Sequence, residues 1–250
     1  SLLFFLGILM LLDPKEKNFF WGAAMVGIGI GVGLQLHILL FFVMPVVVFL
    51  FFLNIFLRKA PIAPLAKKIG IIFLFVLIAN IGQIVYEASH NHSNTNRFFK
   101  AFSKNVKSRG LGQDVETVFL CQAEANLHIL ASTSTGDKCE YPAILSRILT
   151  SRVSGVPLGQ ADEKNILEIA VSLLYTLGGY ILLIYFWRAE NDPAKKRFLA
   201  LVGAYAAVTF FVMIPIIGQA ALRYYIILFF LPFVFLGLWG KFLWEKRKGK

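Results

Sequence analysis

Long apolar runs separated by short polar gaps make up most of this chain. A run of about 20 apolar residues matches the hydrocarbon layer of a membrane, which is about 30 Å thick. Backbone groups find no water there, and the runs lack the period-two alternation of membrane strands, so each run is expected to be a helix. The pattern predicts seven membrane spans, at Ser1–Leu12, Phe19–Leu36, Ile38–Leu57, Ile69–Tyr86, Ile166–Trp187, Phe198–Ala220 and Tyr224–Trp244.

These spans predict a mainly α fold, a polytopic transmembrane helical bundle with one small extracytoplasmic module. Residues 1–86 would hold four spans, residues 87–165 the module, and residues 166–250 three spans with a basic tail. The first span is already under way at Ser1. We therefore expect that span to be incomplete and the chain to be the later part of a longer protein.

Composition agrees with a membrane protein and excludes a soluble domain. Hydrophobic residues make up 58% of the chain and charged residues 16%, whereas soluble domains are about half apolar and about a quarter charged. The net charge of +11 does not indicate nucleic acid as a partner, because the charges stand in short gaps beside apolar spans. That distribution is typical of cytoplasmic loops under the positive-inside rule.

The basic residues also predict the orientation of the chain. Alternate gaps (residues 13–18, 58–68, 188–197 and the tail from Lys241) hold 15 basic and 5 acidic residues, whereas the other gaps, with Glu168, hold 10 and 9. Because basic loops stay in the cytoplasm, the first set and the C-terminus are predicted to be cytoplasmic. Residues 87–165 and the gap around Arg223 are then extracytoplasmic.

Within the external segment, residues 97–107 predict an amphipathic helix and Val115–Cys121 predicts a strand. Cys121 and Cys139, the only cysteines, are 18 residues apart. An oxidising compartment permits a disulfide between them, and two free thiols are the alternative. The spacing of nearby histidine and carboxylate side chains is not typical of zinc, and no metal site is predicted.

A row of glycines in the second span, from Gly27 to Gly33, invites comparison with a dinucleotide-binding loop, but the spacing differs and no strand precedes it. Ala23, Gly27 and Gly31 instead recur every four residues. Such a stripe of small residues predicts close packing of one membrane helix against another.

Three polar groups lie at the predicted external edge of the spans. Gln35 and His37 either contact a substrate or phosphate, or satisfy the end of their helix. Glu87 and His90 stand one helical turn apart and could form an acid/base or orienting pair, or a solvated helix end. Arg223 suits a phosphate because its guanidinium makes paired hydrogen bonds, and the alternative is an arginine that reaches bulk headgroups.

These residues resemble motifs of bacterial membrane glycosyltransferases of the GT-C class, relatives of the dolichyl-phosphate-mannose–protein mannosyltransferases. Gly33–His37 (GLQLH) is similar to their G-L-x-Q-x-H helix, and Tyr86–His90 (YEASH) with Asn94–Arg97 (NTNR) to their aromatic-Glu-x-x-His stretch with a downstream Asn-Thr. Arg223-Tyr224, ahead of Leu231-Pro232, resembles their Arg-Tyr-then-Pro ending. The resemblance covers most of the spans but not residues 111–160.

The resemblance implies an inner-membrane enzyme of the cell envelope that transfers a sugar from a polyprenyl-phosphate donor to a glycan, lipid or protein acceptor on the extracytoplasmic face. It implies no further cofactor. Arg223 and His37 would hold the donor phosphate, and Gln35, Glu87 and His90 would line the substrate site. The family's acidic catalytic residue lies in the first external loop, which is expected before Ser1. The catalytic base is therefore not named, and this part alone is expected to be inactive.

Two other classes remain open. An O-antigen-type polymerase or ligase also has a large external segment, and would use a lipid-diphosphate glycan and external arginines such as Arg97, Arg109, Arg147 and Arg152. A transporter or structural membrane subunit is the non-enzymatic alternative. A transporter should carry ionisable residues near the middle of its spans, and these spans have none there.

Overall fold

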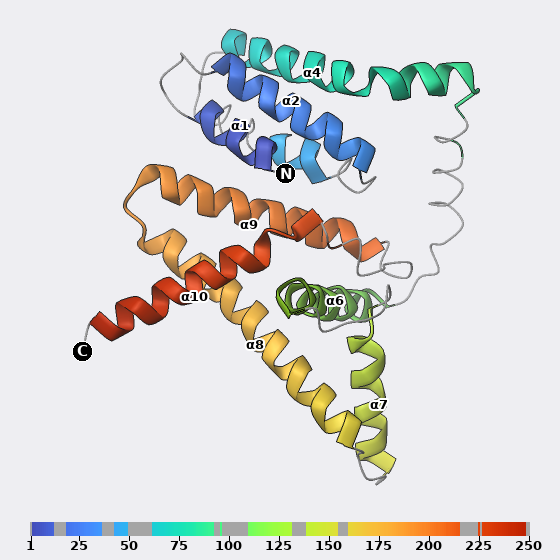
Figure 1. Cartoon of the computed structure of the whole chain (residues 1–250), viewed down its shortest axis with the longest axis vertical. Coiled ribbons are helices and arrows are strands. Elements are labelled where there is room, and N and C mark those ends of the chain that lie inside the picture. Colours follow the sequence, from blue (N-terminus) through green and yellow to red (C-terminus); the bar gives the residue numbers. More distant parts are fainter. Residues whose placement is uncertain are drawn as a thin grey trace. The chain divides into compact units, whose positions relative to one another are not determined.

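The computed structural model describes residues 2–12, 19–36, 43–49, 62–92, 96, 110–131, 139–154, 160–215, 225 and 227–248. Within these ranges every regular element is a helix and none is a strand (Figure 1). The labelled helices are α1 (Leu2–Leu12), α2 (Phe19–Leu36), α4 (Ile62–Ser89), α6 (Leu111–Ala131), α7 (Tyr141–Ser154), α8 (Gln160–Ala189), α9 (Pro193–Met213) and α10 (Leu231–Lys248). Residues 1–106 and 207–212 form one compact unit, and residues 107–206 and 213–250 form another.

Three of the described helices are long and apolar enough to cross a membrane, which fits the prediction of a membrane protein. The apolar stretches are Ala66–Ser89 of α4, Asn165–Ala189 of α8 and Pro193–Met213 of α9. Helices α1, α2 and α10 also lie where spans are predicted. The apolar stretches of α1 and α2 are shorter than a full span requires, and α10 is less apolar. A helical segment at residues 43–49 covers part of the predicted span Ile38–Leu57, whose other residues lie outside the described ranges. The count of seven spans stays a prediction.

In the first unit, glycines let α2 pack closely against two neighbours. A Cβ atom added to Gly27 would lie 2.5 Å from the carbonyl oxygen of Ile72, and one added to Gly31 would lie 2.5 Å from Cβ of Ala79. On the α1 side, a Cβ at Gly29 would lie 2.9 Å from the backbone nitrogen of Phe4. The prediction that these glycines serve helix packing is confirmed, because only a residue without a side chain leaves room for such approaches.

The same contacts give the directions of these helices. From Gly27 to Gly31 the contacts on α4 advance from Ile72 to Ala79, so α2 and α4 run parallel. Gly7 of α1 meets Gly22, at the beginning of α2, whereas the earlier residue Phe4 meets the later Gly29, so α1 and α2 are antiparallel.

Replacing Gly27 by Leu is expected to destabilise the first unit by about 1–3 kcal/mol, because the side chain must push α2 and α4 apart. Gly70→Leu on α4 is the matched control, since a Cβ there meets nothing within 4 Å and a leucine raises helix propensity. Thermal unfolding in detergent, followed by circular dichroism, should show a loss for the first variant only. Equal melting temperatures for the two variants would contradict the packing.

In the second unit, α6, α7 and α8 share a hydrophobic core made of Leu120, Tyr141, Ile144, Ile148 and Ile169. The predicted strand Val115–Cys121 is wrong, because these residues lie inside the 21-residue helix α6. Their branched and aromatic side chains favour strands only weakly, and packing against α7 and α8 decides the conformation. The segment predicted to be extracytoplasmic thus contains at least α6 and α7, whereas residues 97–107 lie outside the described ranges.

Helices α8 and α10 pack against each other and cross at an angle, and their contacts advance in the same direction along both helices (Figure 1). The ring of Phe235 lies where a Cβ of Gly179 would be, and Trp239 does the same at Gly178. The hydroxyl of Tyr175 donates to the carbonyl oxygen of Pro232, and near the other end Nζ of Lys241 lies 3.6 Å from Oε2 of Glu190. The glycine pair on α8 therefore accommodates the aromatic side chains of α10.

Pro215 and Pro232 lie at the ends of helices. Sequence analysis extends the last two spans over Phe198–Ala220 and Tyr224–Trp244, but α9 ends at Met213, two residues before Pro215, and α10 begins only at Leu231, just before Pro232. A proline lacks the N–H that an inner helical turn needs, but the first turn does not need it. Helix α9 also begins earlier than predicted, at Pro193, because the Asp192 carboxylate accepts a hydrogen bond from the Ala194 N–H at 2.8 Å.

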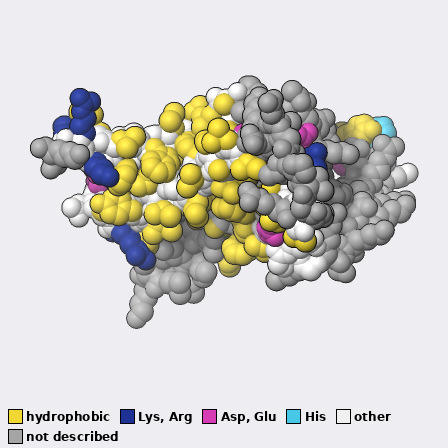
Figure 2. All heavy atoms as spheres, turned by 90° about the horizontal axis from the view of Figure 1, so that it is seen from below, with side chains coloured by type: hydrophobic (Ala, Val, Ile, Leu, Met, Phe, Trp, Pro, Cys, Tyr) yellow, Lys and Arg dark blue, Asp and Glu magenta, His cyan; other side chains and the backbone are white. Residues whose placement is uncertain are grey.

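Large apolar side chains cover the outward faces of α8 and α10. Leu167 and Leu174 of α8 are 66% and 70% exposed, and Leu236 of α10 is 54% exposed. Figure 2 shows hydrophobic side chains gathered over the middle of the face seen there and lysine and arginine side chains at one end of it. Soluble proteins rarely expose apolar surface of this extent, so these faces suit contact with lipid.

Candidate functional site at the end of helix α4

The predicted aromatic-Glu-x-x-His stretch lies at the C-terminal end of α4. The rings of Tyr86 and His90 stack, with centroids 4.1 Å apart and planes 15° from parallel. Nδ1 of His90 lies 3.0 Å from the backbone oxygen of Tyr86 and 2.9 Å from the hydroxyl of Ser89. The immediate partner of His90 is therefore Tyr86, one turn earlier, a pairing that sequence analysis did not predict.

Two contacts of Nδ1 bear on the form of the His90 ring. The Tyr86 carbonyl oxygen can only accept and so favours a proton on Nδ1, whereas the Ser89 hydroxyl can donate to Nδ1 or accept from it. With the proton on Nδ1, the other nitrogen, Nε2, is the acceptor of the neutral ring. An exposed imidazole held in this way can accept a proton from a substrate hydroxyl, or donate one to an anion when it is protonated.

The backbone leaves the helical conformation directly after this site. Asn91 and His92 have φ angles of 49° and 57°, in the left-handed region that commonly ends helices. The N–H of His92 donates to the carbonyl oxygen of Glu87 at 2.9 Å, and the N–H of His90 donates to that of Tyr86 at 3.0 Å. Backbone bonds thus fix the last turn of α4, on which Glu87 is half-buried.

The parallel course of α2 and α4 brings a second predicted group to the same end of the first unit. Gly31 of α2 is level with Ala79 and Asn80 of α4. Gln35 follows Gly31 by one helical turn on α2, and Gln83 and Glu87 follow Ala79 by one and two turns on α4. The common direction of the two helices therefore carries both predicted groups toward the same end of the unit. His37 and Arg223 lie outside the described residues.

Sequence analysis missed a buried carboxylate in the second unit. Glu124 of α6 is 1% exposed, and its oxygens accept hydrogen bonds from the N–H groups of Glu140 and Tyr141, both at 2.9 Å from Oε2. These two N–H groups lie at the N-terminal end of α7, where backbone N–H groups have no hydrogen-bond partner within the helix. Glu124 therefore caps the beginning of α7 from another helix. No sequence signal marks such a partnership, because cap and helix are 16 or more residues apart.

The disulfide lies beside this cap. Cys121 of α6 and Cys139, just before α7, form a bridge with Cα atoms 5.4 Å apart, so the structure selects the bridge over two free thiols. Sγ of Cys139 lies 3.2 Å from Oε2 of Glu124. A bridged sulfur has no proton to donate, so this contact is not a hydrogen bond. The bridge and the carboxylate together fix residues 139–141 to α6.

Burial raises the pKa of Glu124 from its ordinary 4.5 to about 7, because the charged form loses water. The N–H groups of Tyr141 and Glu140 act in the opposite direction, and the loss of water outweighs them. Burial also raises the pKa of Tyr141, whose hydroxyl lies 3.2 Å from Oε1 of Glu168. Glu124 therefore changes its charge near neutral pH.

Buried hydrogen bonds also join α6 to α8. Nδ2 of Asn126 donates to Oγ1 of Thr176 at 3.1 Å, Ser172 donates to the carbonyl oxygen of Ala123, and Nε2 of Gln122 donates to the hydroxyl of Tyr180. Polar side chains are suited to join helices in apolar surroundings, where they would otherwise lack partners. Within the described residues, no three His, Cys, Asp or Glu side chains form a group that could hold a metal ion.

Comparison with known proteins adds no relative. No family model, curated protein or solved structure matches the chain significantly.

Proposed function

We propose that the chain is part of an integral-membrane glycosyltransferase that moves a sugar from a polyprenyl-phosphate donor to a glycan, lipid or protein acceptor. In this proposal the C-terminus and the basic gaps are cytoplasmic, the membrane is the inner membrane, and residues 87–165 are extracytoplasmic. Transfer takes place at the outer membrane edge.

The observation that carries the proposal is the opposite character of the two ends of α4. Lys67 and Lys68 stand near its beginning, and Tyr86, Glu87 and His90 near its end. The apolar stretch of 24 residues rises about 1.5 Å per residue, enough to span the hydrocarbon layer. If the lysines stay in the cytoplasm, the stacked Tyr86–His90 pair lies at the outer edge, where a lipid phosphate and its sugar are accessible.

Each of these residues would have its own role in the transfer. Arg223, with His37, would bind the donor phosphate and stabilise the negative charge that develops on it as the bond between sugar and phosphate breaks. His90, oriented by Tyr86, and Glu87 would position the acceptor hydroxyl, with Gln35 lining the site from α2. The general base that removes the proton of that hydroxyl is not assigned to a residue.

Replacing Arg223 by Ala is expected to lower sugar transfer at least tenfold, because a charge-assisted phosphate contact is lost. Replacing His90 by Ala should lower it by a similar factor. The protein, at the full length found in cells, is reconstituted in liposomes with a polyprenyl-phosphate sugar, and transfer is followed with a labelled donor.

His92→Asn is the matched control for His90. It lies two residues later, outside the predicted motif, and asparagine tolerates its left-handed backbone, so transfer should persist. Unchanged transfer by the Arg223 and His90 variants would contradict the assigned roles. Transfer from a lipid-diphosphate glycan, with none from the monophosphate donor, would instead favour the polymerase or ligase class.

A further inference from the structure

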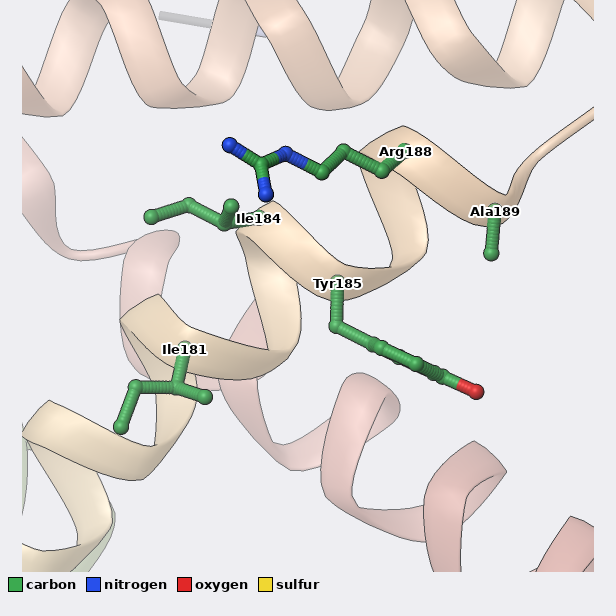
Figure 3. Close-up of a pocket in the computed structure, with 5 residues that line it drawn as sticks. All are labelled: Ile181, Ile184, Tyr185, Arg188 and Ala189. Atoms are coloured by element: carbon green, nitrogen blue, oxygen red, sulfur yellow. The ribbon is translucent and has the colours of Figure 1, made fainter.

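An open groove with a single charged side chain lies on the surface of α8 near its C-terminal end. It has a volume of about 460 Å³ and is lined by Ile181, Ile184, Tyr185, Arg188 and Ala189. Figure 3 shows that the guanidinium of Arg188 turns back along the helix and lies over Ile184, while the Tyr185 hydroxyl points the other way. The groove is thus an apolar surface with one cation over it.

Arg188 differs from its charged neighbours in lacking an acidic partner. Lys241 lies 3.6 Å from Glu190 and 3.8 Å from Glu245, and Lys195 lies 3.9 Å from Asp192. Among the described residues, no carboxylate lies within 4.0 Å of the Arg188 guanidinium. A smaller hollow of about 140 Å³ beside the groove contains Lys241 together with Glu190 and Glu245, so its cation is already neutralised. An anionic ligand is therefore favoured at Arg188 and not at Lys241.

The groove also lies at a suitable depth for lipid. Arg188 is the second-last residue of the 25-residue apolar stretch of α8, which at 1.5 Å per residue slightly exceeds the hydrocarbon thickness. Arg188 and Tyr185 then lie at the level of the headgroups, where aromatic residues gather, and Ile181 and Ile184 lie deeper. Both isoleucines are more than half exposed.

We propose that this groove binds one anionic glycerophospholipid, such as phosphatidylglycerol. Its phosphate pairs with the guanidinium of Arg188, which can bind two phosphate oxygens at once. One acyl chain lies along Ile184 and Ile181. This site lies at the end of α8 that carries the basic residues, and it does not depend on the proposed transfer of sugar.

Arg188→Gln is the test, with Lys246→Gln as the matched control because it removes one exposed positive charge from the same end of the unit. The full protein in detergent micelles is titrated with phosphatidylglycerol, and bound lipid is counted by native mass spectrometry. Arg188→Gln is expected to weaken the tightest binding step at least tenfold, and Lys246→Gln less than twofold. Ile184→Ser should weaken it severalfold, whereas Leu243→Ser, an equally exposed position on α10, should not.

Further titrations distinguish a phospholipid from a soluble anion as the ligand. Phosphatidylcholine should not compete, and neither inorganic phosphate nor glycerol phosphate should occupy the site without an acyl chain. Arg188→Lys keeps the charge and the fold but loses the paired geometry, so it should bind with intermediate affinity. Equal losses for Arg188→Gln and Lys246→Gln would overturn the proposal in favour of general attraction to negative lipid. Displacement by inorganic phosphate would identify a soluble-anion site instead.

Discussion

Removing the Cys121–Cys139 disulfide is expected to lower the free energy of unfolding of the second unit by about 3 kcal/mol. The bridge closes a loop with a sequence separation of 18 residues, and closing a loop of about this length restricts the unfolded chain by roughly that amount. The loss should appear in the Cys121→Ser/Cys139→Ser double variant, unfolded by denaturant in mixed micelles and followed by tryptophan fluorescence.

Reductant provides the control for this experiment. The chain has only two cysteines, so a reducing agent acts on no other bond. It should destabilise the original protein to the level of the double variant and leave the double variant unchanged. If reductant and substitution leave the midpoint of unfolding where it was, the bridge does not hold residue 139 to α6.

Replacing Glu124 by Ala is expected to cost about 3 kcal/mol of stability. The substitution leaves the N–H groups of Glu140 and Tyr141 without their acceptor in a buried place, and each such group costs about 1–3 kcal/mol. Thermal unfolding in detergent at pH 5 measures the loss. Glu124→Gln should be close to the original protein at that pH, because its amide oxygen accepts as the protonated carboxyl does.

The pH dependence of stability gives a sharper test of Glu124. Its pKa is raised from 4.5 to about 7 in the folded chain, so between these values the folded state keeps a proton that the unfolded state releases. Stability is therefore greatest below about pH 4.5 and falls as the pH rises to about 7, by up to about 3 kcal/mol. Glu124→Gln should remove this slope.

Glu140→Gln is the matched control, because Glu140 is adjacent to the same cap but its side chain is exposed. That variant should keep the fall in stability between pH 5 and pH 8. The disulfide and Glu124 hold the same three residues, so combining Cys121→Ser/Cys139→Ser with Glu124→Ala should cost less than the sum of the separate losses. A strictly additive result would show that the two contacts act independently. A slope that survives in Glu124→Gln would show that a group other than Glu124 causes it.

The length of the apolar runs predicted those helices whose formation depends mainly on residues that are close in sequence. The runs that became α1, α2, α4, α8 and α9 could be predicted because a long apolar segment has few conformations that satisfy its backbone in lipid. The Ala23–Gly31 stripe predicted close packing because small residues at a four-residue spacing share one face of a helix. Val115–Cys121 was assigned wrongly because seven residues are too few to separate a strand from a segment of a buried helix.

The candidate site was predictable only in part, because a local pattern does not encode side-chain conformations or the packing of distant helices. The Glu87–His90 spacing located polar chemistry at the end of α4, but not the Tyr86–His90 stack, which depends on the side-chain conformations of the last turn. That Gln35 and Glu87 lie toward the same end of the first unit follows from the parallel packing of α2 on α4, which no local pattern encodes.

By itself, the sequence determined that the chain is helical and holds segments long and apolar enough to cross a membrane, because the length of an apolar run is a property of consecutive residues. Only the tertiary structure decided that Cys121 meets Cys139, that Glu124 caps α7 and that Arg188 lacks an acidic partner among the described residues. Such contacts join residues from different helices or depend on which neighbours fold back beside them. Their energies depend on distance and burial, and these appear only when the helices pack.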